Sequence, residues 1–154
     1  MLAFAAAALF LTLAQGVPAP AASPVVTSAR FFALDARSDP PGISESTTIP
    51  YRPQTSCFAW LLEIEPAKGQ ASIREELRLP SPAPNWGTAE GVTVHPDRAG
   101  ATSRQDVDLS EGVIANQWCV SEGDPVGAHR ISIYSGERLL HRFEFTVIGP
   151  AQAI

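Results

Sequence analysis

The chain has 154 residues, of which 45% are hydrophobic and 18% charged, and it carries a formal net charge of −5. This composition is that of a globular protein, because a disordered chain would be poorer in apolar residues and richer in net charge. The acidic balance does not supply the basic surface that nucleic acid requires, so no nucleic-acid partner is expected.

An apolar run from Met1 to Ala14 opens the sequence, and it is shorter than the roughly 20 residues that a membrane-spanning helix needs. Its length is typical of the apolar region of a signal peptide, although no Lys or Arg precedes it. Small residues suited to cleavage follow at Ala19 and Ala21, or earlier at Gly16. The sequence therefore predicts a cleavable signal peptide over residues 1–22, with an uncleaved anchor as the alternative.

Export would place the rest of the chain in the periplasm or outside the cell. There it would consist of a short flexible segment over residues 23–29 and one domain over residues 30–150, with no membrane span. Cys57 and Cys119 are its two cysteines. In an oxidising compartment an even number favours a disulfide, which would stabilise the fold by about 4 kcal/mol in the chain-entropy model. Two buried free thiols are the alternative.

Fourteen prolines and eleven glycines cut the chain into short intervals, which is typical of β-sandwiches and barrels rather than of helical domains. Residues 30–36 form a first expected strand, and a turn at 38–42 separates it from a polar edge strand at 43–50. Residues 56–65 are expected to form a central strand that is buried on both sides, because both alternating faces are apolar. One face carries Cys57, Ala59 and Leu61, and the other carries Phe58, Trp60, Leu62 and Ile64.

A proline-rich stretch at residues 80–87 divides the middle of the chain and predicts a loop, because its prolines remove backbone donors. Before it, residues 71–79 are expected to form a strand, although Ile73 and Leu77 also fit the spacing of a helix. After it we expect short strands at 91–95 and 106–109, a polar turn at 98–104 between them, and a core strand at 113–120.

The clearest pattern is a β-hairpin, in which residues 128–134 and 138–148 flank a turn at 135–137. Ile131 and Ile133 alternate in the first arm, and the second arm alternates through Leu139, Phe143, Phe145 and Val147. Directly opposed residues share a face of the sheet. This register therefore needs an odd number of loop residues or one bulge, and a two-residue turn is not expected.

In this hairpin, Tyr134 opposite Arg138 would bring His129 and His141 within reach of a common ion, with His95 as a further candidate ligand. A periplasmic metal-binding protein is therefore an alternative function, although zinc normally takes three or four protein ligands. The competing interpretation leaves each imidazole at a strand end or bonded to a backbone carbonyl, and on that interpretation no cofactor is expected.

His95, Asp97 and Ser103 lie close together in sequence, which makes a small hydrolase the second alternative. The chain lacks the G-x-S-x-G and S-x-x-K motifs of hydrolases. Glu75 and Glu76 are adjacent carboxylates, but on a strand they point to opposite faces and cannot flank one scissile bond. We therefore predict that the protein is not an enzyme.

Trp86 and Asn85, in the proline-rich loop, are the residues best suited to a binding surface. An aromatic side chain on a stiff loop supplies contact area at a low entropic cost. The alternative interpretation places Trp86 over the open end of the core as a lid.

The stretch from Asp124 to Val147 resembles the last two strands of immunoglobulin-like domains in bacterial secreted and periplasmic proteins, where a P-x-G turn precedes the pair. Cys57, Trp60 and Cys119 also resemble the Cys-Trp-Cys set of that fold, although Trp60 lies closer to the first cysteine than usual. The resemblance implies an all-β, immunoglobulin-like antiparallel sandwich of about seven to eight strands, and it transfers no catalytic residue.

The leading hypothesis from the sequence is a non-enzymatic binding module in the periplasm or outside the cell. Its partner would be another protein or a component of the cell envelope, bound through a sheet edge or the Trp86 loop.

Overall fold

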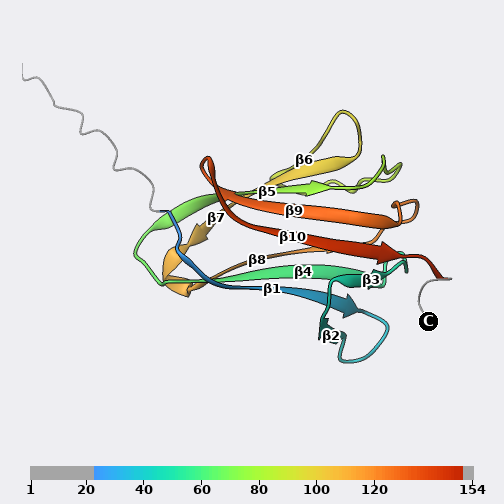
Figure 1. The fold of residues 1–154 in the computed structure, drawn as a ribbon, viewed down its shortest axis with the longest axis horizontal. Coiled ribbons are helices and arrows are strands. Elements are labelled where there is room, and N and C mark those ends of the chain that lie inside the picture. The colour runs from blue at the N-terminus through green and yellow to red at the C-terminus, as the bar shows by residue number, and fades with distance from the viewer. Residues whose placement is uncertain (1–22, 151–154) are drawn as a thin grey trace, which may run out of the picture.

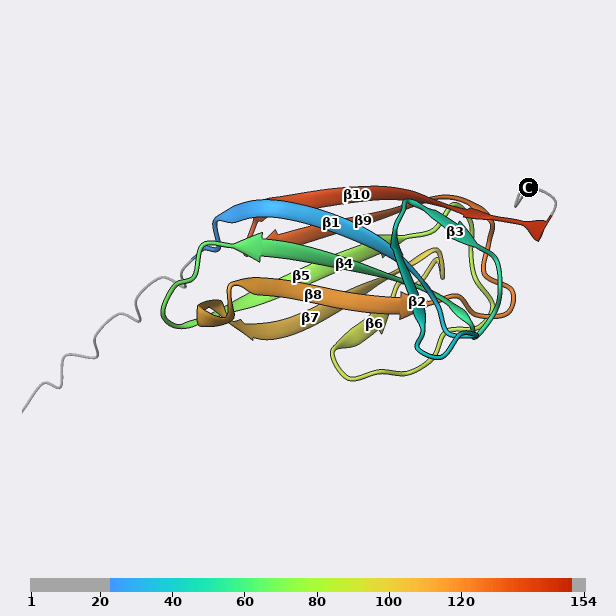
Figure 2. The same ribbon diagram turned by 90° about the horizontal axis from the view of Figure 1, so that it is seen from below.

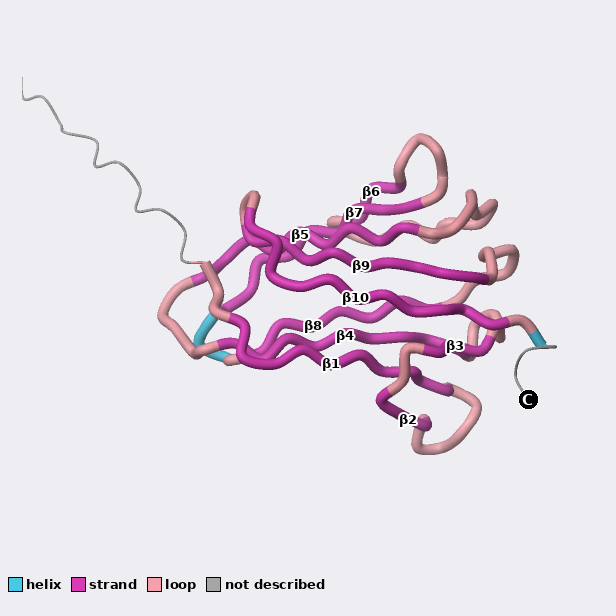
Figure 3. Tube along the Cα trace, viewed as in Figure 1, coloured by secondary structure: helices cyan, strands magenta, loops and turns pink. Residues whose placement is uncertain are grey.

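Alternating apolar and polar residues fold the chain into extended strands. The computed structural model describes residues 23–150, which form ten strands in two facing sheets (Figure 1). Sheet A contains, in spatial order, β2 (Gly42–Glu45), β1 (Val26–Asp35), β4 (Ser56–Ile64) and β8 (Val113–Cys119). Sheet B contains β3 (Thr48–Pro50), β10 (Arg138–Ile148), β9 (Gly127–Ser135), β5 (Gln70–Arg78), β7 (Gly100–Asp108) and β6 (Val92–Val94). Loops join the strands at both ends of the sandwich, and a 3-10 turn at Leu109–Glu111 leads into β8 (Figure 3).

The inner faces of the two sheets meet in a core of aromatic and aliphatic side chains, and Figure 2 shows the two layers from below. The ring centroid of Phe145 in β10 lies 4.8 Å from that of Phe31 in β1 and 4.6 Å from that of Phe58 in β4. Trp60 and Ile133 are fully buried, one from each sheet. Burial of each such side chain contributes about 1.5–3 kcal/mol, so the inward positions of both sheets stabilise the sandwich.

The expectation that residues 56–65 are buried on both sides is wrong for one face. Phe58 and Trp60 point into the core, but Ala59 and Leu61 lie on the outer face of sheet A and are only half-buried. Within residues 23–150, no other strand covers this face, and Ile43 remains 66% exposed on it. The apolar residues on the outer face of β4 therefore gave the sequence pattern of a strand that is buried on both sides.

Three element boundaries differ from the sequence prediction. β1 begins at Val26, so part of the segment expected to be flexible at 23–29 belongs to the sandwich. Residues 43–50 form two short strands, because the chain crosses from sheet A to sheet B between β2 and β3. The polar turn expected at 98–104 lies largely within β7, which pairs with β5 along its whole length. By contrast, the strand expected at 71–79 is confirmed as β5.

The β9–β10 hairpin keeps the expected apolar register but reaches it by a different turn. Phe143 is opposite Ile131, as alternation required. Arg138 is opposite Ser135, however, so the turn has two residues, Gly136 and Glu137, and a register shift follows between Leu139 and His141. The bulge alternative is therefore confirmed, and the statement that a two-residue turn is not expected is wrong.

The predicted signal peptide over residues 1–22 lies outside the described residues. Within the described ones, no helix is long and apolar enough to cross a membrane.

Candidate functional site

Among residues 23–150, Glu75 is the only acidic side chain that is buried, with 2% of its surface exposed. It occupies an inward position of β5 and reaches across the core to β8. Asn116 Nδ2 donates to Glu75 Oε2 at 2.6 Å, and Trp118 Nε1 donates to Glu75 Oε1 at 2.5 Å. The carboxyl group thus ties strand β8 of sheet A to the facing strand of sheet B.

Burial raises the pKa of Glu75 above its ordinary value, because an ionised carboxylate loses its hydration in the core. Hydrogen bonds from Asn116 and Trp118 lower this pKa by less than burial raises it. The indole N–H of Trp60 exerts a smaller influence of the same sign, although it does not reach hydrogen-bond geometry with any partner. The side chains of β8 therefore form hydrogen bonds with both carboxyl oxygens, but these bonds do not fully offset the free energy that ionising a buried carboxyl group costs.

A cavity of about 250 Å³ lies between the C-terminal half of β8 and the proline-rich loop. Its walls are mainly apolar and aromatic, and they include Phe58, Leu77, Trp86, Trp118, Val120 and His129. Trp86 is half-buried and packs against the core while its Nε1 donates to Arg98 O at 3.1 Å. It therefore covers the core and at the same time forms one wall of the cavity.

The proline-rich loop that carries Trp86 is held by hydrogen bonds between its residues and residues outside it. Arg98 Nε donates to Ala83 O at 3.2 Å, and Asn85 Nδ2 donates to Glu122 O at 2.8 Å. Gly123 approaches the loop so closely that a Cβ atom there would lie 2.6 Å from Pro84 Cγ. The loop is thus fixed before any ligand binds, which lowers the entropic cost of binding to it.

Strand β8 is one edge of sheet A (Figure 2). Its residues Gln117, Trp118 and Cys119 line the cavity. Val120 N donates to Ser56 O, and Ile64 N donates to Gly112 O, so the even-numbered residues of β8 form the hydrogen-bonded pairs with β4. The backbone N–H and C=O groups of the odd-numbered residues therefore point away from the sheet. Two of them are bonded by side chains: Gln105 Nε2 donates to Ala115 O, and Gln117 N donates to Asn116 Oδ1.

The structure does not bring the three histidines together. His129 is opposite Phe145 and His141 is opposite Ile133, so the two histidines are four ladder positions, about 13 Å, apart. The expected pairing of Tyr134 with Arg138 is replaced by Tyr134 with Leu139. Among the described residues, no group of three His, Cys, Asp or Glu side chains is arranged to hold a metal ion.

His129 instead donates from Nδ1 to the backbone oxygen of Gly127 at 2.9 Å and stacks on Phe145. Burial lowers the pKa of His129 and, at the more exposed position, that of His141. Both rings are therefore neutral near pH 7, and the one on His129 forms part of the cavity wall.

His95, Asp97 and Ser103 do not form a hydrolytic triad either. Arg78 donates from Nη1 to His95 Nδ1 and from Nη2 to Asp97, and His95 Nε2 then donates to Thr102 Oγ1 at 2.9 Å. Ser103 follows Thr102 on β7 and points to the opposite face, into the core. The hydrogen bonds of the imidazole thus go to Arg78 and Thr102 rather than to the serine or the aspartate.

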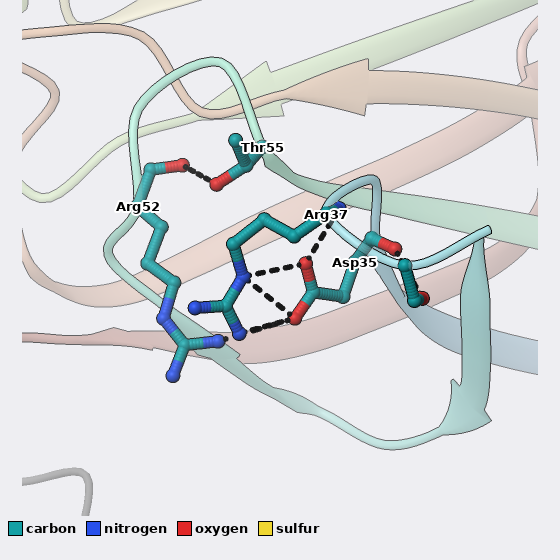
Figure 4. A network of polar contacts seen from close by, with 5 residues as sticks. Asp35, Arg37, Arg52 and Thr55 are labelled. Carbon is teal, nitrogen blue, oxygen red and sulfur yellow. Dashed lines mark hydrogen bonds and ion pairs between the residues drawn. The ribbon is translucent and has the colours of Figure 1, made fainter.

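A second polar cluster joins the β1–β2 loop to the β3–β4 loop (Figure 4). Asp35 accepts hydrogen bonds from Arg37 Nη2 at 2.6 Å and from Arg52 Nη1 at 3.3 Å, and Thr55 Oγ1 donates to Arg52 O. The hydrogen bonds from Arg37 hold the pKa of Asp35 well below its usual range. Because the group is exposed and its ion pairs link residues of two loops, its role is to fasten those loops.

The family model described as the PM0630 beta sandwich domain matches residues 29–148. The chain belongs to this family. It is also similar in fold to an immunoglobulin-like protein from Pseudomonas aeruginosa known from a crystal structure, with a TM-score of 0.53 and 15% sequence identity. That likeness covers 82% of this chain and 98% of the other. A search of curated proteins finds no match.

The expected immunoglobulin-like sandwich is thus confirmed, although residues 23–150 form ten strands rather than about seven to eight. This PM0630 beta sandwich domain differs from the immunoglobulin pattern in its disulfide. Cys57 and Cys119 are bonded, as predicted, with Cα atoms 3.9 Å apart. They are directly opposed on β4 and β8, so the bond joins neighbouring strands of one sheet rather than the two sheets. Trp60 lies on the inner face of β4, whereas Cys57 lies on the outer face, so this tryptophan does not pack on the disulfide.

The sequence prediction missed the group formed by Glu75, Asn116 and Trp118. The alternation that predicted β5 carries one signal: Glu75 shares the inward face with Ile73 and Leu77. Its partners could not be inferred, because they lie 41 and 43 residues further along the chain.

Proposed function

We propose that this PM0630 beta sandwich domain is a non-enzymatic binding module that acts outside the cytoplasm. It takes up an extended segment of a partner protein as an additional strand along the free edge of β8. The observation that carries this proposal is the composition of that edge: seven residues, Val113–Cys119, with no charged side chain and no proline. Native sheets usually shield an edge of this length with charges, prolines, bulges or short strands.

The other three sheet edges of the described chain are shielded in these ways. β2 has four residues and follows Pro40 and Pro41, β3 has three residues and ends at Pro50, and β6 has three residues and is followed by Pro96 within two positions. Strand β8 is longer, and its pairing with β4 runs without a register shift. It therefore offers the regular row of outward donors and acceptors that strand addition needs.

Two side-chain hydrogen bonds to the edge of β8 are compatible with reversible binding of a partner strand there. Gln105 and Asn116 each satisfy one outward backbone group in the free protein. A partner strand would replace these two bonds with backbone hydrogen bonds, while the Asn116 amide keeps its bond to Glu75 and the Gln105 amide turns to water. The edge is thus protected against uncontrolled pairing without being closed.

The location outside the cytoplasm is supported by two independent features. The apolar run before residue 22 fits a signal peptide, and the disulfide between Cys57 and Cys119 needs an oxidising compartment to persist. The absence of enzyme activity is supported by the separation of His95, Asp97 and Ser103 described above.

A proline in the edge of β8 tests the proposal. The N–H of Ala115 points outward, so Ala115→Pro removes it without breaking a bond to β4, and edge strands tolerate proline at such positions. Peptides selected by the wild-type domain from a random twelve-residue display library should bind this variant at least tenfold more weakly. Ala115→Thr is the matched control, because it enlarges the side chain and keeps the N–H, and it should bind within about threefold of wild type. Equal binding of peptides by the proline variant would contradict strand addition at β8.

A further inference from the structure

We propose that the cavity between Trp86 and Trp118 is an anchor pocket for one aromatic side chain of the segment that pairs with β8. This inference rests on the proposed strand addition and adds the residue class that the partner must carry.

The size of the cavity selects a single side chain. An apolar cavity of about 150 Å³ accommodates benzene, and sites for drug-sized ligands begin near 300 Å³. At about 250 Å³ the pocket is large enough for one or two fused rings and smaller than most sites for whole metabolites. These dimensions favour the side chain of a single partner residue. The backbone of that residue would at the same time form hydrogen bonds with the edge of β8.

The register of strand addition brings a partner side chain to the pocket. A strand that bonds to Gln117 and Cys119 places one residue directly opposite Trp118, and directly opposed residues share a face of the sheet. Trp118 points inward, toward Glu75. The opposed partner residue therefore also points inward, on the side where Trp118 lines the cavity. Pairs of this kind, without mutual backbone hydrogen bonds, also bring side chains closest together.

The walls of the pocket favour an aromatic guest over other apolar ones. Two indole rings and the Phe58 ring line it, and aromatic pairs gain about 0.5–1.5 kcal/mol beyond area burial alone. Both indoles are held in place before binding, Trp118 by the Glu75 carboxyl group and Trp86 by Arg98 O. Asp124 also lines the cavity and disfavours an acidic side chain.

The indole N–H signals of the three tryptophans provide a direct test of the pocket in the intact domain. Titration of the ¹⁵N-labelled protein with N-acetyltryptophanamide should move the Trp86 and Trp118 signals in a saturable way, because the probe has no strand to add and can report only on the pocket. N-acetylalaninamide should leave them unchanged at the same concentrations. Assignment by Trp86→Phe and by Trp118→Phe identifies the signals. Absence of a saturable shift, or equal shifts with both probes, would overturn the anchor pocket.

A second experiment separates failure of the pocket from failure of strand addition. In the peptides selected by the wild-type domain, the aromatic residue is replaced by alanine, and each pair is measured against wild type and Trp86→Ala. The replacement should weaken binding to the wild-type domain at least tenfold. It should weaken binding to Trp86→Ala less than threefold, since that variant has already lost the Trp86 wall of the pocket. Equal weakening with both proteins would overturn the pocket while Ala115→Pro still reports on the edge. Ala89→Phe should fill the pocket and leave the Trp86 wall intact. This variant should bind peptides with the aromatic residue more weakly than wild type does, and should bind their alanine versions equally well.

Discussion

Glu75 is the residue at which this sandwich departs most from an apolar core. A carboxyl group whose pKa is raised in the folded state binds a proton more strongly there than in the unfolded chain. Between the ordinary pKa and the raised one, the folded state therefore holds more protons, and the free energy of unfolding falls as pH rises. Ionisation of Glu75 thus destabilises the fold at higher pH, because the buried carboxylate loses its hydration.

Glu75→Gln should remove this contribution to the pH dependence. Urea unfolding of wild type and variant, followed from pH 4.5 to pH 8, should show the free energy of unfolding of the wild type falling relative to that of the variant as pH rises. At the acidic end the variant should be less stable by about 1–3 kcal/mol, because its amide N–H faces the donor of Asn116. Parallel pH profiles for the two proteins would show that Glu75 does not titrate in this range.

At the scale of single residues, the sequence predicted the pairings that follow from a residue count or from parity. The disulfide between Cys57 and Cys119 was expected from the cysteine count, and the opposition of Phe143 to Ile131 from parity. The proposed common site of His129 and His141 was wrong, because parity places residues on a face and does not fix their distance along it.

At the scale of elements, β4 and β8 are coupled by both the disulfide and the ladder. Replacement of Cys57 and Cys119 by alanine should lower the free energy of unfolding by about 2–4 kcal/mol, because the unfolded chain gains the freedom of an open loop. Urea titration checks this, with a reducing agent as the internal control. The agent should destabilise wild type to the level of the variant and leave the variant unchanged, and an unaffected wild type would contradict a stabilising disulfide.

Strands with a clear apolar pattern were predictable, including the short strand β6, whereas the point at which the chain changes sheet was not. The apolar residues on both faces of 56–65 and the period of two in 138–148 predicted β4 and β10 directly. The division of residues 43–50 into β2 and β3 depends on which sheet each piece joins, and no local pattern records that choice. The polar side chains of β7 suggested a turn because sheet B exposes its outer face to water.

At the scale of the whole molecule, the fold has two unlike sheets. Sheet A has half-buried apolar side chains such as Leu61 on its outer face and ends in the uncharged strand β8, while sheet B ends in the two three-residue strands β3 and β6. The candidate site lies where the edge of sheet A meets the proline-rich loop. Its components come from segments far apart in the sequence, which is why the sequence indicated the loop of Asn85 and Trp86 but did not identify β8 as the sheet edge beside it.

The central claim is that a partner segment adds to β8, and amide hydrogen exchange on the complex with a selected peptide measures this most directly. The outward amides of Val113, Ala115 and Cys119 should exchange at least tenfold more slowly when the peptide is bound, because each would donate to, or be covered by, the added strand. Amides at the edges β2, β3 and β6 should keep their rates. Slowing confined to another edge, or unchanged rates along β8 with peptide bound, would contradict the account.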